Sequence, residues 1–143
     1  MVRSLHIVLA GVPMMPARPD SGPLPAVPTL DRDIFGSITL LADRRPDFAN
    51  RIIARYIEQS RRALEELSTA VIREDFDTAR LVAHKLKGSS RQIGASRLSE
   101  LCERVLRACE RSDAETVRRK MPAVIRTHAE TLQALLAVED LVN

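Results

Sequence analysis

The stretch from Phe76 to Ile93 constrains the fold of this chain most strongly. Its apolar or small residues recur at alternating spacings of three and four, which places them along one side of an α-helix: Phe76, Ala79, Ala83, Leu86, Ser90 and Ile93. A stripe of this kind fits a helix that lies along the seam of a helical bundle. Gly94 should end the helix, because glycine readily adopts the left-handed conformation found just beyond helix ends.

Similar patterns predict further helices between about Leu30 and the end of the chain. Asp31 is a plausible N-cap for the first, and Pro46 suits the first turn of the second. The second should bury a stripe of six residues: Phe48, Ile52, Tyr56, Leu64, Leu67 and Val71. A capping box at Ser112–Glu115 should begin the last, and Pro122 should kink that helix or leave a broken first section. The five expected ranges are about 31–42, 47–73, 75–93, 96–110 and 112 to the end.

Composition supports the same fold class. Hydrophobic residues make up 45% of the 143 residues but aromatic residues only 3%, so the core must consist of Leu, Ile, Val and Ala. Such a core suits packed helices better than a sheet. We therefore predict an all-α fold, an antiparallel four-helix bundle with a short extra N-terminal helix.

Residues 1–29 differ in character from the rest of the chain. Most of the eight prolines lie in residues 13–28, so we interpret residues 1–29 as a Pro-rich N-terminal segment or linker and residues 30–143 as the bundle domain. The apolar run at residues 5–15 is too short to span a bilayer. We expect a cytoplasmic monomer without direct membrane insertion, either free-standing or joined to a larger protein.

His84 does not fit the apolar stripe. It follows Ala83 directly and therefore projects about 100° away from the seam. The residues that share its face are Arg80, Lys87, Gly88 and Arg91. We expect His84 to lie on a solvent-facing strip surrounded by positive charge, where the imidazole is available as a nucleophile.

Gly88 and Lys87 give this strip a chemical interpretation. A glycine inside a helix costs about 1 kcal/mol relative to alanine, and here it leaves room for another surface one turn from His84. Lys87, also about one turn away, can neutralise an anion on the imidazole. Positioning and charge stabilisation are what phosphoryl transfer mostly requires, so the three residues predict a phosphoryl-accepting site.

Residues 84–90, His-Lys-Leu-Lys-Gly-Ser-Ser, resemble the His-x-Leu-Lys-Gly-Ser motif of histidine-containing phosphotransfer (Hpt) domains. The similarity continues through the lead-in at residues 75–80 and the pattern at residues 93–103, and covers about residues 30–137. The resemblance implies a phosphorelay intermediate that takes a phosphoryl group from an aspartate of one receiver domain and passes it to another. It implies no kinase activity of the chain's own and no cofactor, since Mg²⁺ would belong to the receiver.

The resemblance also implies roles for particular residues. His84 matches the phosphorylated histidine, Lys87 the lysine near the phosphoryl group, and Gly88 the glycine that leaves room for the receiver. The docking face would surround His84 on the helices at 75–93 and 96–110, and its candidate contacts are Arg80, Lys85, Lys87, Gly88 and Arg91. The partners would be receiver domains of response regulators or of a hybrid sensor histidine kinase.

One position departs from the family pattern. Many members hold the imidazole with a glutamine on the next helix, where this chain has Leu106. Gln92 could substitute only if the helix end bends it back. A non-catalytic adaptor that binds a receiver without accepting phosphate therefore remains an alternative. Nucleic-acid binding is a weaker one, because the net charge is only +3 and no DNA-reading motif is present.

The remaining histidines and cysteines have structural interpretations. His128 lies one turn from Val124 and from Leu132, so we expect it to be structural. Cys102 and Cys109 are two helical turns apart on an apolar face, too far for a disulfide, and should be core residues. No spacing typical of a metal site occurs.

Overall fold

A computed structural model describes residues 29–142 of the chain. These residues form five helices and no strand: α2 (Arg32–Arg44), α3 (Pro46–Ile72), α4 (Phe76–Gln92), α5 (Ser96–Glu110) and α6 (Ala114–Val142). The all-α prediction is confirmed for this part of the chain, and each helix begins and ends close to its expected limits. The Pro-rich segment proposed for residues 1–29 lies outside the described residues, apart from Thr29.

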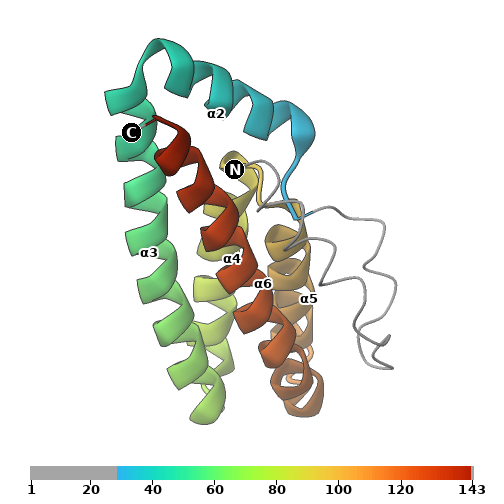
Figure 1. Ribbon diagram of the computed structural model, residues 1–143. Coiled ribbons are helices and arrows are strands. Elements are labelled where there is room, and N and C mark those ends of the chain that lie inside the picture. Colours follow the sequence, from blue (N-terminus) through green and yellow to red (C-terminus); the bar gives the residue numbers. More distant parts are fainter. Residues whose placement is uncertain (1–28, 143) are drawn as a thin grey trace.

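The four long helices form the bundle that the sequence predicted. Helix α4 packs against α3 and α5, and α6 closes the bundle by packing against α5 and α3. Figure 1 shows α2 lying across one end of this bundle, where it contacts α3 and, more weakly, α6. Short turns connect successive long helices, so neighbours in the chain run antiparallel.

The seam of α4 is buried as its spacing predicted. Ala79, Ala83 and Ser90 have no exposed surface, Leu86 is 1% exposed, and only Phe76 at the start of the stripe is partly open. The side chains that fill the centre of the bundle include Ile53, Leu67, Leu98, Leu101 and Leu135. Burying a side chain of this size stabilises the fold by about 1.5–3 kcal/mol.

The buried face of α3 differs from the predicted one near its N-terminus. Ala49 and Ile53 are fully buried, whereas Phe48 is 39% exposed and Ile52 lies at the edge of the core. The guanidinium groups of Arg45 and Arg51 stack over the Phe48 ring, at 5.1 and 5.9 Å from its centroid. The prediction was wrong because it favoured large apolar residues, whereas a small residue such as Ala49 lets helices approach closely.

Two hydrogen bonds fix polar side chains inside the core. The hydroxyls of Tyr56 and Ser90 are 2.8 Å apart and join α3 to α4. Burial raises the pKa of Tyr56 to about 12, so the phenol stays protonated at neutral pH. Ser60 Oγ lies 2.8 Å from His128 Nε2 and joins α3 to α6. His128 is 4% exposed, as expected for a structural histidine.

The capping box predicted at Ser112–Glu115 is wrong by one residue. Asp113 caps α6, because its carboxylate accepts hydrogen bonds from the Thr116 amide at 3.2 Å and the Thr116 hydroxyl at 2.7 Å. Ser112 precedes this cap with a φ of 53° and closes the α5–α6 turn. Asp75 and Thr78 make the same pair of bonds at the start of α4, after Glu74 with a φ of 56°.

Pro122 does not divide the last helix. Helix α6 continues through this position, so the expected broken first section is not formed. Pro122 is exposed, so the carbonyl that lacks an amide partner can be hydrated. Val117, Met121 and Val124 are buried on the opposite side, and their packing holds the helix together around the proline.

The Asp113 cap leads to a first prediction. We expect Asp113→Ala to lower the free energy of unfolding by about 1 kcal/mol, because it leaves amides at the start of α6 unbonded. Ser112→Gly should not destabilise the protein, because glycine adopts a positive φ at no steric cost. Urea unfolding followed by circular dichroism measures both, and equal losses in the two variants would contradict this assignment of the cap.

A second prediction concerns acid stability. Burial, and secondarily the charge of Arg61, lowers the pKa of His128 below its ordinary value of 6.5. The unfolded chain therefore binds more protons than the folded one between these two pKa values, and stability falls as the pH drops below about 6.5. We expect unfolding free energies measured from pH 7.5 to 5.5 to fall less in His128→Gln, each protein being compared with itself at pH 7.5. Parallel curves would contradict the prediction.

Candidate functional site

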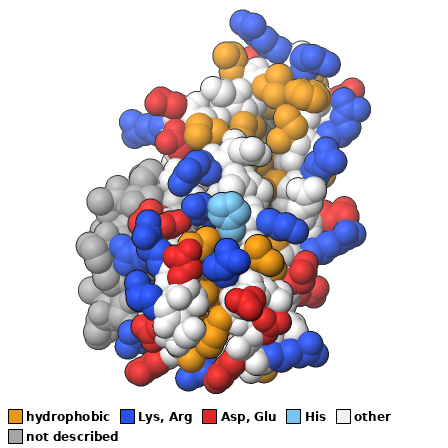
Figure 2. Space-filling view, turned by 180° about the vertical axis from the view of Figure 1, so that it is seen from behind, with side chains coloured by type: hydrophobic (Ala, Val, Ile, Leu, Met, Phe, Trp, Pro, Cys, Tyr) orange, Lys and Arg blue, Asp and Glu red, His pale blue; other side chains and the backbone are white. Residues whose placement is uncertain are grey.

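Helix α4 presents His84 to solvent at the middle of its outer face. The buried stripe through Ala83 and Leu86 fixes the rotation of the helix, and His84 projects about 100° from Ala83. Of the two histidines in residues 29–142, only His84 is exposed. Figure 2 shows one histidine on this face of the molecule with Lys and Arg side chains around it. The predicted exposure of His84 is confirmed.

The predicted cations differ in where they lie around His84. Lys85 and Arg91 are exposed, whereas Arg80 and Lys87 are partly buried. Burial raises the pKa of the Cys109 thiol on α5, and the charge of Arg80, which shares the face of Lys87 on α4, opposes this shift. Arg91 is two turns from His84, about 10 Å along the helix axis. The site is therefore an imidazole bordered by cations, with Lys87 and Arg80 on the α5 side.

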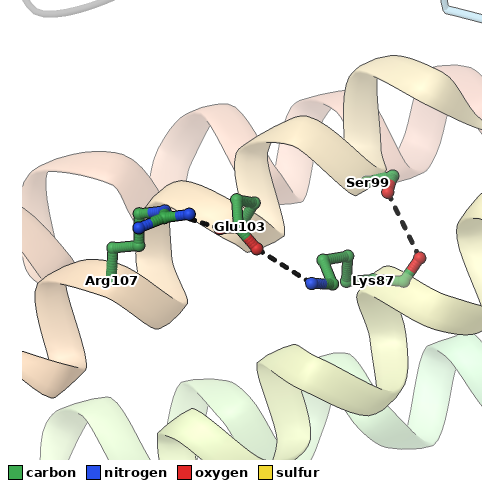
Figure 3. Close-up of polar contacts among 4 residues, drawn as sticks. All are labelled: Lys87, Ser99, Glu103 and Arg107. Atoms are coloured by element: carbon green, nitrogen blue, oxygen red, sulfur yellow. Dashed lines mark hydrogen bonds and ion pairs between the residues drawn. The ribbon is translucent and has the colours of Figure 1, made fainter.

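Lys87 is held by α5, which the sequence analysis missed. Its Nζ donates a hydrogen bond to Glu103 Oε1 at 2.9 Å, and Arg107 Nε donates to Glu103 Oε2 at 2.6 Å, as Figure 3 shows. These bonds lower the pKa of Glu103, with the Lys87 bond as the main cause, and keep the carboxylate ionised. The spacing of Glu103 and Arg107 was visible in the sequence. The pairing of Glu103 with Lys87 depends on how α4 packs against α5.

Gly88 leaves an open position beside the imidazole. A Cβ built at this residue would meet no atom within 4 Å, so packing within the fold does not require a glycine here. The backbone on either side is ordinary α4 helix, and Ser99 Oγ donates a hydrogen bond to the carbonyl oxygen of Lys87 at 3.2 Å. The space over Gly88 therefore faces outward and is available to another molecule.

Neither Leu106 nor Gln92 orients the imidazole of His84. Leu106 is 9% exposed and its side chain offers no hydrogen bond to the imidazole. Gln92 lies eight residues after His84 on the same continuous helix, about 12 Å along its axis. It lines a small pocket with Tyr56 and Gln59, between α4 and α3. The condition under which Gln92 could substitute, a helix end that bends it back toward His84, is therefore not met.

Leu81 is a further residue of this face that the sequence analysis did not single out. It precedes His84 by three residues, so the two share one face of α4, and it is 53% exposed. Its position on the helical wheel, away from the seam, was the available signal. Leu81 adds an apolar contact next to a polar site.

The other candidate residues contribute no second site. Cys102 and Cys109 are buried free thiols, and burial raises the pKa of both, that of Cys102 to about 12. Among the side chains that the structure describes within residues 29–142, no group of three or more His, Cys, Asp and Glu could hold a metal ion. None of the helices in this range combines the length and apolar character that crossing a bilayer requires.

Known proteins share both the sequence pattern and the fold. Histidine-containing phosphotransfer protein 4 of Arabidopsis thaliana is 30% identical over 102 residues, which cover 70% of this chain and 80% of that protein. Pseudo histidine-containing phosphotransfer protein 5 of Oryza sativa subsp. japonica is 32% identical over 102 residues, 70% of this chain and 67% of that protein.

Solved structures agree in architecture. Histidine-containing phosphotransfer protein B from Pseudomonas aeruginosa PAO1 is similar with a TM-score of 0.72 and 21% identity, over 79% of this chain and 96% of that chain. The maize protein of the same type has a TM-score of 0.69 and 20% identity, over 80% and 88%. The sequence matches the Hpt domain over residues 51–140. With this match, and a bundle that exposes one histidine, the chain belongs to the Hpt domain family, the histidine-containing phosphotransfer proteins of multistep phosphorelays.

Proposed function

We propose that His84 accepts a phosphoryl group from an aspartyl phosphate on one receiver domain and passes it to an aspartate on another. The observation that carries this proposal is the pairing of the exposed His84 with the open position over Gly88, one turn away on α4. An aspartyl phosphate must come within bonding distance of the imidazole. A residue without a side chain at this position leaves the space that such an approach needs.

The transfer requires little covalent chemistry from the protein. A ring nitrogen of His84 attacks phosphorus, the bond from phosphorus to the aspartate oxygen breaks, and the carboxylate leaves with the electron pair. The proton of the imidazole stays on its other nitrogen and can then be lost to water. Lys87 and Arg80 supply positive charge on the α5 side of the group being transferred. Mg²⁺ would act in the acidic pocket of the receiver.

The receiver would dock on the outer face of α4 and its flank on α5. Leu81 offers an apolar contact, and the cations around it offer charge complementary to an acidic partner site: Arg80, Lys85, Lys87 and Arg91. An apolar centre with a polar rim is the usual composition of an interface between proteins. A cytoplasmic location and residues 30–143 as the functional domain belong to the same proposal. The partners in it are receiver domains of response regulators or of a hybrid sensor histidine kinase.

An adaptor that binds a receiver without being phosphorylated is the second candidate. Leu106 favours it, because this buried side chain offers no hydrogen bond to orient the imidazole. A relative that is 32% identical is also named a pseudo histidine-containing phosphotransfer protein. His84→Ala separates the two candidates: the adaptor requires that this variant bind the receiver and transmit the signal as the wild type does.

The central prediction concerns His84 itself. Incubation with a phosphorylated receiver domain should label the wild-type protein with an acid-labile, base-stable phosphoryl group. His84→Gln should carry no label, because its side-chain amide is not a nucleophile, and should remain folded because the position is exposed. Label that persists in His84→Gln, or wild-type protein that no receiver labels, would contradict the proposal.

A further prediction concerns Gly88, where one substitution should raise the stability of the fold and lower the rate of phosphoryl transfer. Gly88→Ala should raise the free energy of unfolding by up to about 1 kcal/mol, because alanine favours the helix and the added methyl meets open space. Phosphoryl transfer from the receiver should slow about tenfold or more, because the methyl displaces the docked partner.

Gly36 provides the matched control for Gly88. It also lies inside a helix, α2, and a Cβ there would likewise meet nothing within 4 Å. Gly36→Ala should therefore raise stability by a similar amount and leave the transfer rate unchanged. Equal transfer rates in the two alanine variants would show that Gly88 has no special role in docking.

A further inference from the structure

The carboxylate of Glu103 lies between two cations. One oxygen accepts from Lys87 at 2.9 Å and the other from Arg107 at 2.6 Å, so each oxygen has its own partner. The Lys87 and Glu103 side chains are only 19% and 23% exposed, whereas Arg107 is 66% exposed. The pair of Lys87 and Glu103 is thus partly shielded from solvent, and Arg107 supports it from outside (Figure 3).

This arrangement restrains Lys87 from two sides. Its ammonium is bound by Glu103, and its backbone carbonyl accepts a bond from Ser99, also on α5. Lys87 is three residues from His84, so its side chain can reach either a group on the imidazole or the carboxylate on α5. An ammonium that is already paired with a carboxylate attracts another anion less strongly than a free one.

The polar contribution of α5 to the site also differs from the pattern expected of the family. The position expected to orient the imidazole holds the buried Leu106, whereas Glu103, one turn earlier on the same helix, directs a carboxylate to the lysine. Helix α5 therefore acts on Lys87 rather than on the imidazole.

We propose that Glu103 is a positioning residue that holds Lys87 against α5 and competes with a phosphoryl group on His84 for the same ammonium. The inference rests on the proposed function of His84. A phosphoryl group carries up to two negative charges and draws Lys87 toward His84, while Glu103 opposes this movement. The competition makes phosphohistidine less stable relative to the aspartyl phosphate of the receiver, so the group can leave His84 again.

The test uses Glu103→Gln, which keeps the shape of the side chain and removes its charge. The measured quantity is the equilibrium constant for transfer from a receiver domain that labels the wild-type protein. It should shift toward phosphohistidine about two- to fivefold, as expected for a partly exposed ion pair, and less at high salt. In a Lys87→Ala background the same substitution should have no effect.

A matched control is available on the same helix. Glu100 pairs with Arg104 at 3.9 Å and has no such bond to Lys87, so Glu100→Gln makes the same charge change without releasing the lysine. This variant should keep the wild-type equilibrium constant. If the role of Glu103 were purely structural, Glu103→Gln would lower the free energy of unfolding. The same loss would then occur in the Lys87→Ala background.

The possible results separate the inference from the function on which it rests. An unchanged or smaller equilibrium constant in Glu103→Gln, with normal labelling of the wild type, would overturn the role of Glu103 alone. An equal shift of the equilibrium constant in Glu100→Gln would also overturn it, because the change in net charge alone would then explain the effect. Wild-type protein that accepts no label would overturn both.

Discussion

The structure depends on a division of α4 into two faces. Ala79, Ala83 and Ser90 are small and fully buried, so α4 fits closely between α3 and α5 and needs only a narrow stripe to do so. The remaining surface of α4 is not needed for packing and can carry residues that face solvent. Because Ala83 fixes the rotation of the helix, the adjacent His84 must point outward. The position of the reactive group thus follows from the packing of the core.

Local signals in the sequence predicted most of the fold. The Asp31 cap of α2, the end of α4 just before Gly94 and the stripe through Leu86 depend on residues a few positions apart, and all three were confirmed. The buried face of α3 was not predicted correctly. Both Phe48 and Ala49 are apolar and differ by one residue in rotation, so only the packing of neighbouring helices decides which is buried.

The candidate site also has one part that local spacing predicts and another that depends on how the helices pack. His84, Lys87 and Gly88 occupy neighbouring turns of one helix, so their spacing predicted a shared face. Glu103 lies sixteen residues from Lys87 and on another helix, so its role appears only when α4 and α5 are packed together. Leu81 was within reach of the sequence, because an apolar residue opposite the buried stripe has no place in the core.

The open space over Gly88 has a consequence for changing this protein. Nothing inside the fold would resist a larger side chain there, and a better helix former would be tolerated or favoured. A search for variants that resist heat would therefore tend to replace this glycine. The resulting protein would be more stable but would bind a receiver domain less well. The open space over Gly88 is needed only for docking, and a selection for heat resistance does not test docking.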